Sequence, residues 1–449
     1  MKSRIAKYLP LIIILTFFTT PVFSEGSGPK RQPHKLTLME AIQIATHNNY
    51  LVKETIEKQR AAVEAEKSAT ADLLPKLSAS YSYTRLKHSP YAIFNYSQLP
   101  IGPQKVAIGD KDNYGWDVGF TQPIFTGFAL ITKRKIAQLG VSVSKIEREQ
   151  AILDITKRVK IAYYRILLAK RLVEVAREEV KQLQSHVHDA QLFYKQELIP
   201  RNDLLKSQVA LAQAKQKLAR AKSSFKVAVS ALNTLLSWDV TKNTRVEDIP
   251  GFEPSEYNEK ALFKKALKNR PELKILKTAI HEAELGIKMA KSAYYPKIFA
   301  FGRYEQKGDD LLATSSDYTN THNAAVGIQA KWTFFEWGKT RAEVKRNFHQ
   351  KNALVERFRG IEDSIKLEVR DAYQKLNVAK ENIETAKKAL LQARENFRIT
   401  NLQYQQQVTT STEVLDARTY LTQAQVNYYG ALYGYMMAEA ELARAIGSK

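Results

Sequence analysis

Cysteine is absent from this 449-residue chain. Its absence excludes disulfide bonds, catalysis by a thiol and an N-terminal lipid anchor attached to cysteine. Long apolar segments are also absent beyond the first residues, because nothing there approaches the roughly eighteen uninterrupted apolar residues that a membrane-spanning helix requires. These absences leave neither a covalent cross-link nor a helical membrane anchor.

A catalytic or metal-binding constellation is missing as well. His281-Glu282 begins like the helix of a zinc protease, but the second histidine of that motif is absent. His186 and His188 lie two residues apart on a predicted helix, so their side chains do not share a face. Gly338-Lys339-Thr340 ends like a phosphate-binding loop, but Thr333 stands where that motif begins with glycine. We therefore predict that the protein is not an enzyme and uses no metal or cofactor.

The first residues have the order of a secretory signal. Basic residues precede an apolar run from Leu9 to Phe18, and Val22-Phe23-Ser24 supplies residues that a signal peptidase accepts. We expect residues 1–24 to be a signal peptide that is cleaved near Ser24; a buried N-terminal helix is the less favoured alternative. An exported chain without a helical anchor is either a soluble secreted protein or a β-barrel, because only helices and closed barrels satisfy their backbone in lipid.

The formal charge is strongly positive, at +23. In a cytoplasmic protein such a charge would suggest nucleic acid as a partner. Here the predicted export argues against that partner, and lysine and arginine are spread along the predicted helices instead of forming one block. We interpret the charge as a solvated surface that could face anionic lipid head groups.

The chain contains an internal repeat. Residues 73–79 (LLPKLSA) recur as residues 294–300 (YYPKIFA), 221 positions later, and Ala162-Tyr163 recurs as Ala372-Tyr373, 210 positions later. The first half therefore carries about eleven additional residues, which we place in a predicted long loop over residues 87–113, rich in Pro, Gly and Tyr. The predicted units are a first repeat over residues 25–236, a linker over 237–257, a second repeat over 258–446 and a short tail over 447–449.

Each half contains two long segments with a sustained seven-residue pattern. Apolar residues recur in alternating steps of three and four, and large side chains alternate with alanine, which permits close packing of neighbouring helices. The pattern predicts helical hairpins over residues 128–236 and 338–445, with a first helix roughly 100 Å long. In that helix the pattern comprises Val159, Ala162, Ile166, Ala169, Val173, Ala176, Val180, Leu183, Val187 and Ala190.

Four short segments alternate with period two and predict β-strands over residues 76–86, 114–124, 297–305 and 323–333. Each is about ten residues long, the length of a tilted transmembrane strand. Three of the four tryptophans lie in these strands or just beyond them, which suits the aromatic residues of a membrane interface. They are Trp116, Trp332 and Trp337. Four strands cannot close a barrel and an open edge is not tolerated in lipid, so a barrel must be shared by several chains.

Related motifs open the two halves and their returning helices. The opening motif consists of residues 36–41 (LTLMEA), Ala45 and Asn48-Asn49, and its counterpart in the second half consists of Ala266-Leu267, Asn269 and residues 270–273 (RPEL). Residues 203–205 (DLL) and 413–417 (EVLDA) begin the returning helices. Together these motifs resemble those of the TolC / outer membrane efflux protein family, over nearly the whole chain after the signal. The resemblance implies a mainly α fold with a transmembrane β part. Each chain would give four strands to a shared 12-stranded trimeric barrel, and its helices would form a coiled-coil periplasmic tunnel.

The resemblance also implies a function. It implies a passive, gated exit duct for small molecules or secreted proteins in the outer membrane of a Gram-negative bacterium, in contact with outer-membrane lipid. The homotrimer would dock through its helical tips to a periplasmic adaptor and an inner-membrane pump or ABC transporter. It identifies neither the cargo nor the particular pump.

Two hypotheses from other classes remain open at this point. A secreted coiled-coil structural or adhesive protein explains the seven-residue pattern but not the aromatic alternating segments. A basic nucleic-acid-binding protein explains the charge but neither the signal nor the strands, and we expect no nucleic-acid partner.

The resemblance places functional residues at the hairpin tips. Glu413 and Asp416 match the acidic pair that lines the narrow periplasmic end of the pore in the family, and their spacing puts both on one helix face. In a trimer these carboxylates would form a ring that attracts cations. The alternative is that Glu413 supports the N-terminus of a helix through its negative charge.

Other tip residues match the family only in part. Tyr404 and Asp203 match positions of the contacts that hold the closed tunnel, and Tyr194 is the counterpart of Tyr404 in the first half. The arginine that completes those contacts in the family aligns with Thr409, so its salt bridge cannot form in the same way. Whether the tunnel is closed at rest is therefore not determined. The glycines expected in the two hairpin turns are replaced by Glu197 and Gln407.

Overall fold

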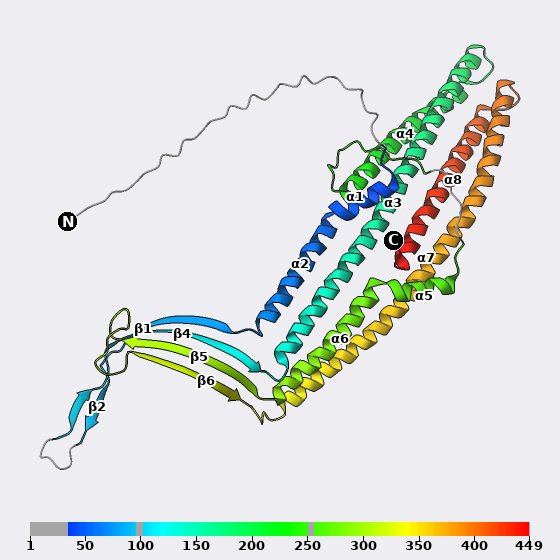
Figure 1. The fold of residues 1–449 in the computed structure, drawn as a ribbon. Helices are drawn as coiled ribbons and strands as arrows, with labels where there is room; N and C mark the ends of the chain where they lie inside the picture. The colour runs from blue at the N-terminus through cyan, green and yellow to red at the C-terminus, as the bar shows by residue number, and fades with distance from the viewer. Residues whose placement is uncertain (1–34, 96–101, 250–255, 449) are drawn as a thin grey trace, which may run out of the picture.

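The computed structural model describes residues 35–95, 102–249 and 256–448. The described chain is elongated, with a β-sheet at one end and long helices that lead away from it to two hairpin tips (Figure 1). The predicted signal peptide, residues 1–24 with cleavage near Ser24, lies outside the described residues. None of the described helices is both long and apolar enough to cross a membrane.

The helices form two equivalent sets, one in each half of the chain. The first set is α1 (Leu38–Asn48), α2 (Tyr50–Ala71), α3 (Ala129–Lys195) and α4 (Arg201–Leu235). The second is α5 (Glu259–Asn269), α6 (Pro271–Lys291), α7 (Lys339–Gln405) and α8 (Ser411–Ala445), with a 3-10 turn η1 (Ser292–Tyr294) after α6. The helices α3 and α7 are both 67 residues long, and α4 and α8 are both 35 residues long.

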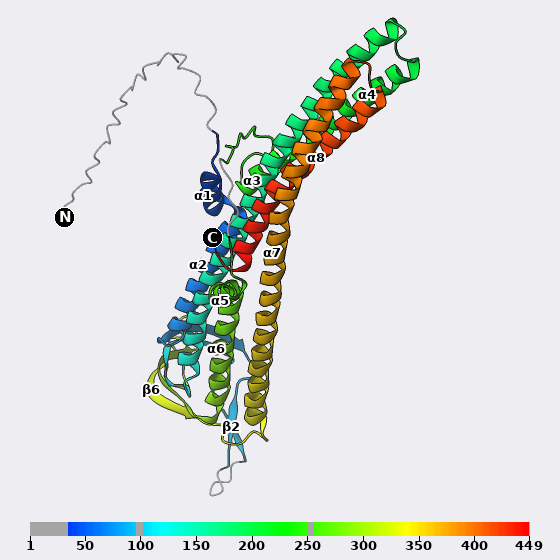
Figure 2. The same ribbon diagram turned by 90° about the vertical axis from the view of Figure 1, so that its right-hand side faces the viewer.

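The long helices pack through the seven-residue pattern. On α3, the pattern residues Val159, Ile166, Val180 and Leu183 are buried. The helix α4 lies along the tip half of α3 and α2 along its sheet-side half, while α8 and α6 do the same for α7 (Figure 1). Figure 2, turned by 90°, shows these helices side by side and bending along their length. Each repeat is therefore a two-helix layer over its whole length.

The main sheet contains four antiparallel strands. These are β1 (Lys76–Arg85), β4 (Asp112–Phe125), β5 (Lys297–Gly308) and β6 (His322–Lys331), in the order β1-β4-β5-β6. The strands β1 and β6 form its two edges. The predicted fold class, a mainly helical and duplicated chain with a small β part, is confirmed.

A second, two-stranded sheet lies where the sequence predicted only a long loop. The strand β2 (Tyr91–Phe94) pairs with β3 (Gln104–Ala107), and this hairpin projects beyond the main sheet (Figure 1). The prediction of a loop throughout residues 87–113 is therefore wrong. Each strand is only four residues long, and the surrounding Pro and Gly hid an alternation that short.

The duplication extends to the backbone where the strands lead into the long helices. Gly127 and Phe128 precede α3 with φ of 61° and 69°, and their counterparts Trp337 and Gly338 precede α7 with φ of 50° and 81°. Left-handed backbone favours glycine, and each junction has glycine at one of its two positions. At Gly127 the close approach of the chain adds a second requirement, because a Cβ there would lie 2.4 Å from the Ser292 carbonyl oxygen.

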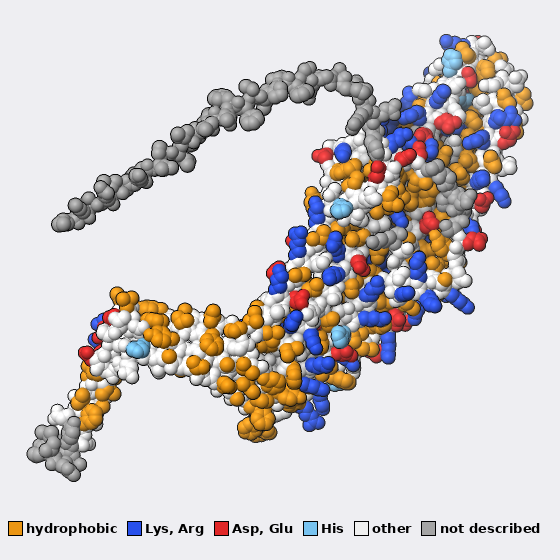
Figure 3. Space-filling view, viewed as in Figure 1, with side chains coloured by type: hydrophobic (Ala, Val, Ile, Leu, Met, Phe, Trp, Pro, Cys, Tyr) orange, Lys and Arg blue, Asp and Glu red, His pale blue; other side chains and the backbone are white. Residues whose placement is uncertain are grey.

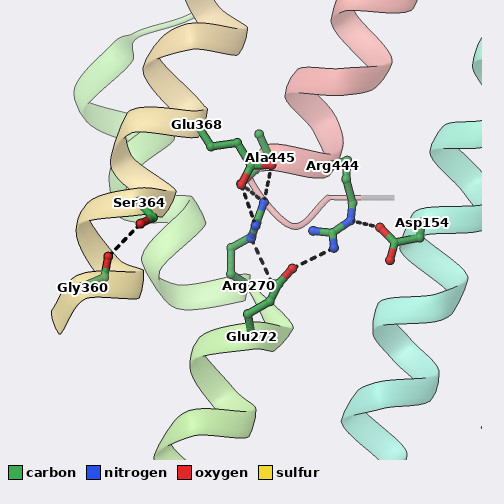
Figure 4. Close-up of polar contacts among 8 residues, drawn as sticks. All are labelled: Asp154, Arg270, Glu272, Gly360, Ser364, Glu368, Arg444 and Ala445. Carbon is green, nitrogen blue, oxygen red and sulfur yellow. Dashed lines mark hydrogen bonds and ion pairs between the residues drawn. The ribbon is translucent and has the colours of Figure 1, made fainter. Parts of the chain in front are cut away.

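Ion pairs join the helices where α5 is followed by α6 and where α8 ends (Figure 4). Arg270, which precedes α6, is 5% exposed and forms a bidentate pair with Glu368 of α7, at 2.7 and 3.0 Å. Its Nη1 also donates to the carbonyl oxygen of Ala445 at the end of α8, at 3.2 Å. Through Glu272 the network reaches Arg444 of α8, which also pairs with Asp154 of α3.

The first half makes the equivalent helix-end contact with a neutral side chain. Asn49 donates from Nδ2 to the carbonyl oxygen of Leu235 at the end of α4, at 2.8 Å. Asn49 lies 221 residues before Arg270, and Leu235 lies 210 residues before Ala445, which are the two offsets of the sequence repeat. One structural position is therefore filled by an amide in one repeat and by a guanidinium in the other.

Candidate functional site

Both helical hairpins turn through the same backbone motif at their tips. After each long helix two N–H groups donate back to carbonyls of its last turn, as in a Schellman motif. The left-handed residue of this motif is usually glycine, but here it is Glu197 with φ of 57° and Gln407 with φ of 62°. A side chain with a Cβ is disfavoured in this conformation by about 1 kcal/mol, so both turns are mildly strained.

The end of α7 is held against α3 by aromatic side chains. Tyr404 is 2% exposed, and its ring centroid lies 4.8 Å from that of His186 and 5.5 Å from that of Phe193. Burial raises the pKa of the Tyr404 hydroxyl. The predicted tip residue Tyr404 is therefore a packing residue between the two hairpins within one chain.

A buried polar cluster lies beside Tyr404 and joins α3, α4 and α8. The Ser411 hydroxyl oxygen lies 2.8 Å from Nε2 of His186 and 3.0 Å from the hydroxyl oxygen of Ser207. All three residues are buried. Burial lowers the pKa of the His186 imidazole to about 4, because the charged form loses its hydration there. His186 is consequently neutral at pH 7, and its protonation would oppose this packing.

Buried polar residues continue along the contact between α8 and α3. Ser411, Arg418 and Gln425 recur every seven residues on α8, and all three are buried. Arg418 is 2% exposed, donates to the side-chain oxygen of Gln182 on α3 and lies 5.6 Å from the ring centroid of Phe397. Among the described residues, its Nε and Nη2 have no hydrogen-bond partner. The contact between the hairpins thus leaves buried hydrogen-bond donors of Arg418 without partners among the described residues.

Sequence reasoning missed this polar stripe, which we define as Ser411, Arg418 and Gln425. The apolar seven-residue pattern of this helix runs through Ala417 and Ala424, each one position before a member of the polar stripe. A second seven-residue pattern of polar residues on the same helix was the signal that could have revealed it. Polar residues at such positions fix the register of helices at a cost in stability.

The predicted acidic pair lies on the exposed side of α8. Glu413 and Asp416 are both exposed, and no ion pair involves either carboxylate within the described residues. The N-cap of α8 is Thr410, whose hydroxyl accepts a hydrogen bond from the Glu413 N–H at 3.4 Å. The cap therefore uses the backbone of Glu413 and leaves its carboxylate available for other interactions.

The remaining predicted tip residues are not brought together in one chain. Asp203 lies in the first turn of α4, with a carboxylate oxygen 3.6 Å from Nζ of Lys206. Thr409 is half-buried in the second turn, and Tyr194 is 39% exposed at the end of α3. Tyr404 instead packs against His186 and Phe193. Burial raises the pKa of its hydroxyl, and the nearby charge of Asp203 acts in the same direction.

The sheet has two faces of opposite character. The pairing register places Ala79 opposite Val118, Val118 opposite Tyr304, and Tyr304 opposite Ala324, so these residues share one face. That face is apolar and also carries Leu77, Tyr81, Phe120, Ile298, Ala300, Val326 and Ile328. The opposite face is mainly polar and carries Ser78, Ser80, Ser82, Asp117, Arg303, Glu305, Lys307, Asn323 and Gln329, with Phe299 and Phe301 as aromatic exceptions. On the apolar face Val326 is 86% exposed. No described part of this chain covers that face, so its apolar side chains remain on the surface.

The three predicted tryptophans lie toward the two ends of the strands. Trp332 and Trp337 lie where the sheet joins the helices, and Trp337 is 91% exposed. Trp116 is half-buried nearer the other end and donates from its ring N–H to the Leu312 carbonyl oxygen in the β5–β6 loop, at 3.3 Å. Hydrophobic side chains gather over the sheet and at its junction with the helices, whereas Lys and Arg are spread over the helices (Figure 3).

No group of three or more His, Cys, Asp and Glu side chains in the described part of the chain is arranged to hold a metal ion.

The fold is that of outer-membrane channels. The outer-membrane channel CmeC of Campylobacter jejuni has the same fold with a TM-score of 0.77, at 16% identity, over 91% of this chain and 85% of that one. The chain belongs to the outer membrane efflux protein family, whose model matches residues 41–237 and 262–448.

Two named relatives are similar along most of their length. The alkaline protease secretion protein AprF of Pseudomonas aeruginosa is 22% identical over 91% of this chain and 83% of its own. The outer membrane protein TolC of Vibrio cholerae is also 22% identical, over 92% of this chain and 90% of its own. These findings agree with the resemblance seen in the sequence and identify an outer-membrane duct for efflux or secretion.

Proposed function

We propose that three copies of this chain close into one ring that spans the outer membrane and continues as a tunnel. The observation that carries this proposal is that the sheet and the helical layer each have two edges without a neighbour, and that these edges lie on the same two sides of the chain. The strands run in the order β1-β4-β5-β6. In the helical layer α3 contacts both α4 and α8, α8 contacts α7, and α4 and α7 lie at the outside.

The open edges predict how the copies meet. The strand β6 of one copy would pair with β1 of the next, and α7 of one would pack on α2 and α4 of the next. An interface of this head-to-tail kind makes a closed ring when the rotation returns to its start. Ring closure also removes both free strand edges, which lipid does not tolerate.

The two faces of the sheet predict its orientation in this ring. The apolar face, with Val326 and Ile328 exposed, would contact lipid, while the serine-rich and charged face would line the channel. Trp332 and Trp337 at the helix end and Trp116 nearer the other end suit the two interfaces of an outer membrane. The helices would then extend into the periplasm.

At the tips, Glu413 and Asp416 are proposed to form an acidic ring at the narrow periplasmic end. Both carboxylates are exposed in the single chain, and Thr410 already supplies the helix cap. The resting tip is proposed to be held within each chain by Tyr404 and by the His186–Ser207–Ser411 cluster. These contacts would replace the salt bridge that Thr409 cannot form, with Asp203 and Tyr194 at the margin of the tip.

The proposed activity is passive export, without catalysis. The duct would work with a periplasmic adaptor and an inner-membrane pump or ABC transporter, and its cargo would be small molecules or secreted proteins. The name of the relative AprF, a secretion protein, and the family name together favour this role. A signal peptide cleaved near Ser24 would direct the chain to the envelope.

A planar-bilayer recording tests the channel and the acidic ring together. We expect discrete conductance steps and a preference for K⁺ over Cl⁻ that falls when Glu413→Gln and Asp416→Asn are combined. The matched control is Glu395→Gln, which removes a carboxylate that is paired with Arg398 on α7 and should leave selectivity unchanged. Unchanged selectivity in the double variant would reject the ring, and an absence of conductance in the unmodified protein would reject the channel.

A further inference from the structure

The polar face of the sheet carries more positive than negative charge. The register places Lys76, Lys297, Arg303, Lys307 and Lys331 on this face, with Asp117 and Glu305 as the only carboxylates among the paired strand residues there. The charges are not mixed evenly along the strands. Those distant from the helices neutralise one another, while those nearest the helices do not.

The distant group is an internal ion-pair cluster. Arg303 lies 3.4 Å from a carboxylate oxygen of Asp117 and 3.2 Å from one of Glu305. Lys307 lies 3.4 Å from the same Glu305 oxygen. Two cations and two carboxylates therefore balance in this part of the face, and the cluster presents little net charge to a solute.

The group nearest the helices has no such balance. Lys297, the first residue of β5, lies directly opposite Lys331, the last residue of β6. Both side chains are exposed, and neither forms an ion pair within the described residues. Like charges directly opposite each other destabilise a pair of strands. An anion between them would relieve that repulsion, and nothing else on this part of the sheet does so.

A third lysine continues this edge across the proposed subunit boundary. Lys76 begins β1 on the same face and at the same helix-side end of the sheet, where it pairs with Asp72 at 2.9 Å. If β6 of one copy neighbours β1 of the next, Lys297, Lys331 and the next copy's Lys76 would follow one another along the rim. Lys76 is already offset by Asp72, so the unbalanced positive charge at this rim comes from Lys297 and Lys331.

We propose that Lys297 and Lys331 of each copy form an anion-binding collar inside the duct, at the junction between barrel and tunnel. This inference rests on the proposed channel, with the polar face of the sheet turned inward. The collar attracts phosphate or carboxylate groups, since lysine rings favour anions in pores. It is opposite in sign to the acidic pair Glu413 and Asp416, which lies near the start of α8. This helix begins at the hairpin tip that is distant from the sheet (Figure 1). The duct therefore has a cation-attracting entrance and an anion-attracting collar in series.

The test is the reversal potential in a KCl gradient, measured for the unmodified trimer and for the double variant Lys297→Gln and Lys331→Gln. We expect the permeability ratio of K⁺ to Cl⁻ to rise about twofold in the double variant. Inorganic phosphate added to the solution should reduce the current through the unmodified channel more than through the double variant. The variant Lys297→Arg with Lys331→Arg keeps both charges and should retain the original selectivity.

Lys307→Gln is the matched control, because Lys307 is on the same face but is paired with Glu305. It should change the permeability ratio less than the double variant does. A channel whose selectivity is unchanged in the double variant, or changes equally in Lys307→Gln, would overturn the collar and leave the channel intact. A protein that forms no channel at all would overturn both the collar and the proposed function.

Discussion

The two repeats have the same helices but bury them to different extents. The helix α3 has 21 buried residues, whereas the equally long α7 has 6. Their shorter partners show the reverse, with 5 buried residues on α4 and 14 on α8. The helices α3 and α8 therefore form the inside of the subunit, and α4 and α7 form its two outer edges.

This difference shows that duplication did not produce two self-sufficient halves. The exposed side of α7 carries large apolar residues along its length, including Leu367, Val378, Leu391 and Leu402. On α3, large exposed apolar residues occur only near the two ends, at Ile131, Leu192 and Tyr194. A helix that exposes apolar side chains over several turns needs a cover, and in the proposed ring a second copy of the chain would supply it.

The largest expected effect comes from the α7 edge. Leu391 and Leu402 lie eleven residues, or about three turns, apart on α7 and are 57% and 46% exposed. We expect the double variant Leu391→Glu and Leu402→Glu to abolish the trimer, because two carboxylates would be buried at each interface between adjoining copies. Size-exclusion chromatography with light scattering in detergent measures the change.

The matched control for that variant is Leu391→Met with Leu402→Met, which keeps both positions apolar. It should remain a trimer. If the double glutamate variant remains a trimer, this side of α7 lies outside the subunit interface. The distinction between inner helices α3 and α8 and outer helices α4 and α7 would then not explain the assembly.

A second effect distinguishes the two helix-end contacts. Arg270→Ala leaves the Glu368 carboxylate and the Ala445 carbonyl without their partner, and we expect the free energy of unfolding to fall by about 3 kcal/mol. Asn49→Ala removes the equivalent neutral contact and a helix cap, so a loss of about 1–2 kcal/mol is expected. Denaturant titrations followed by circular dichroism measure the free energy of unfolding of both variants. Equal losses would show that the charge of Arg270 contributes no stability beyond that of the neutral contact.

The third effect is a pH dependence at the tip. The pKa of His186 is about 4 in the packed tip and about 6.5 when exposed, so the packed form is favoured while histidine is neutral. As the pH falls below about 6.5 the exposed form gains a proton first, and the packed tip loses about 2 kcal/mol by pH 5. We expect hydrogen exchange in the last turns of α3 and α7, after correction for the intrinsic effect of pH, to accelerate between pH 7 and pH 5.

His186→Asn is the matched variant, because its amide can still bond to Ser411 but does not titrate in this range. Its exchange rate, corrected for the intrinsic effect of pH, should be constant over the same interval. An unchanged pH dependence in this variant would assign the effect to another group near the tip.

The smallest expected effect concerns the two tip turns. Gln407→Gly should raise the free energy of unfolding by about 1 kcal/mol, since residue 407 has a φ of 62° that glycine adopts without strain. Gln406→Gly is the control, because residue 406 has a φ of −89° and gains nothing from glycine. A similar gain from Glu197→Gly would show that the two turns are energetically equivalent as well as alike in backbone.

The sequence predicted the elements whose signal is local. The seven-residue pattern extended far enough to give both long hairpins, and the alternation of Ser78, Ser80 and Ser82 with apolar residues gave β1 and its partners. Shorter elements were missed, such as β2 and β3, whose alternation covers four residues each. The strictness of a pattern and its length thus decided what could be predicted.

The candidate site was less predictable, because its contacts join distant segments. Arg270 contacts Glu368 and Ala445, which lie 98 and 175 residues away along the chain, and no local pattern relates them. His186 and Ser411 lie 225 residues apart, on different repeats, and their contact breaks the symmetry of the duplication. The resemblance to the family indicated the tips, but the residues that pack this tip had to be found in the structure.

In the proposed assembly, the two unpaired edges of each chain meet those of its neighbours and close a ring of three. The most direct test is the mass of the purified assembly, measured by native mass spectrometry after release from detergent. A ring of three copies predicts a single species with three times the mass of the processed chain. A monomer, or a series of open oligomers of increasing size, would contradict it.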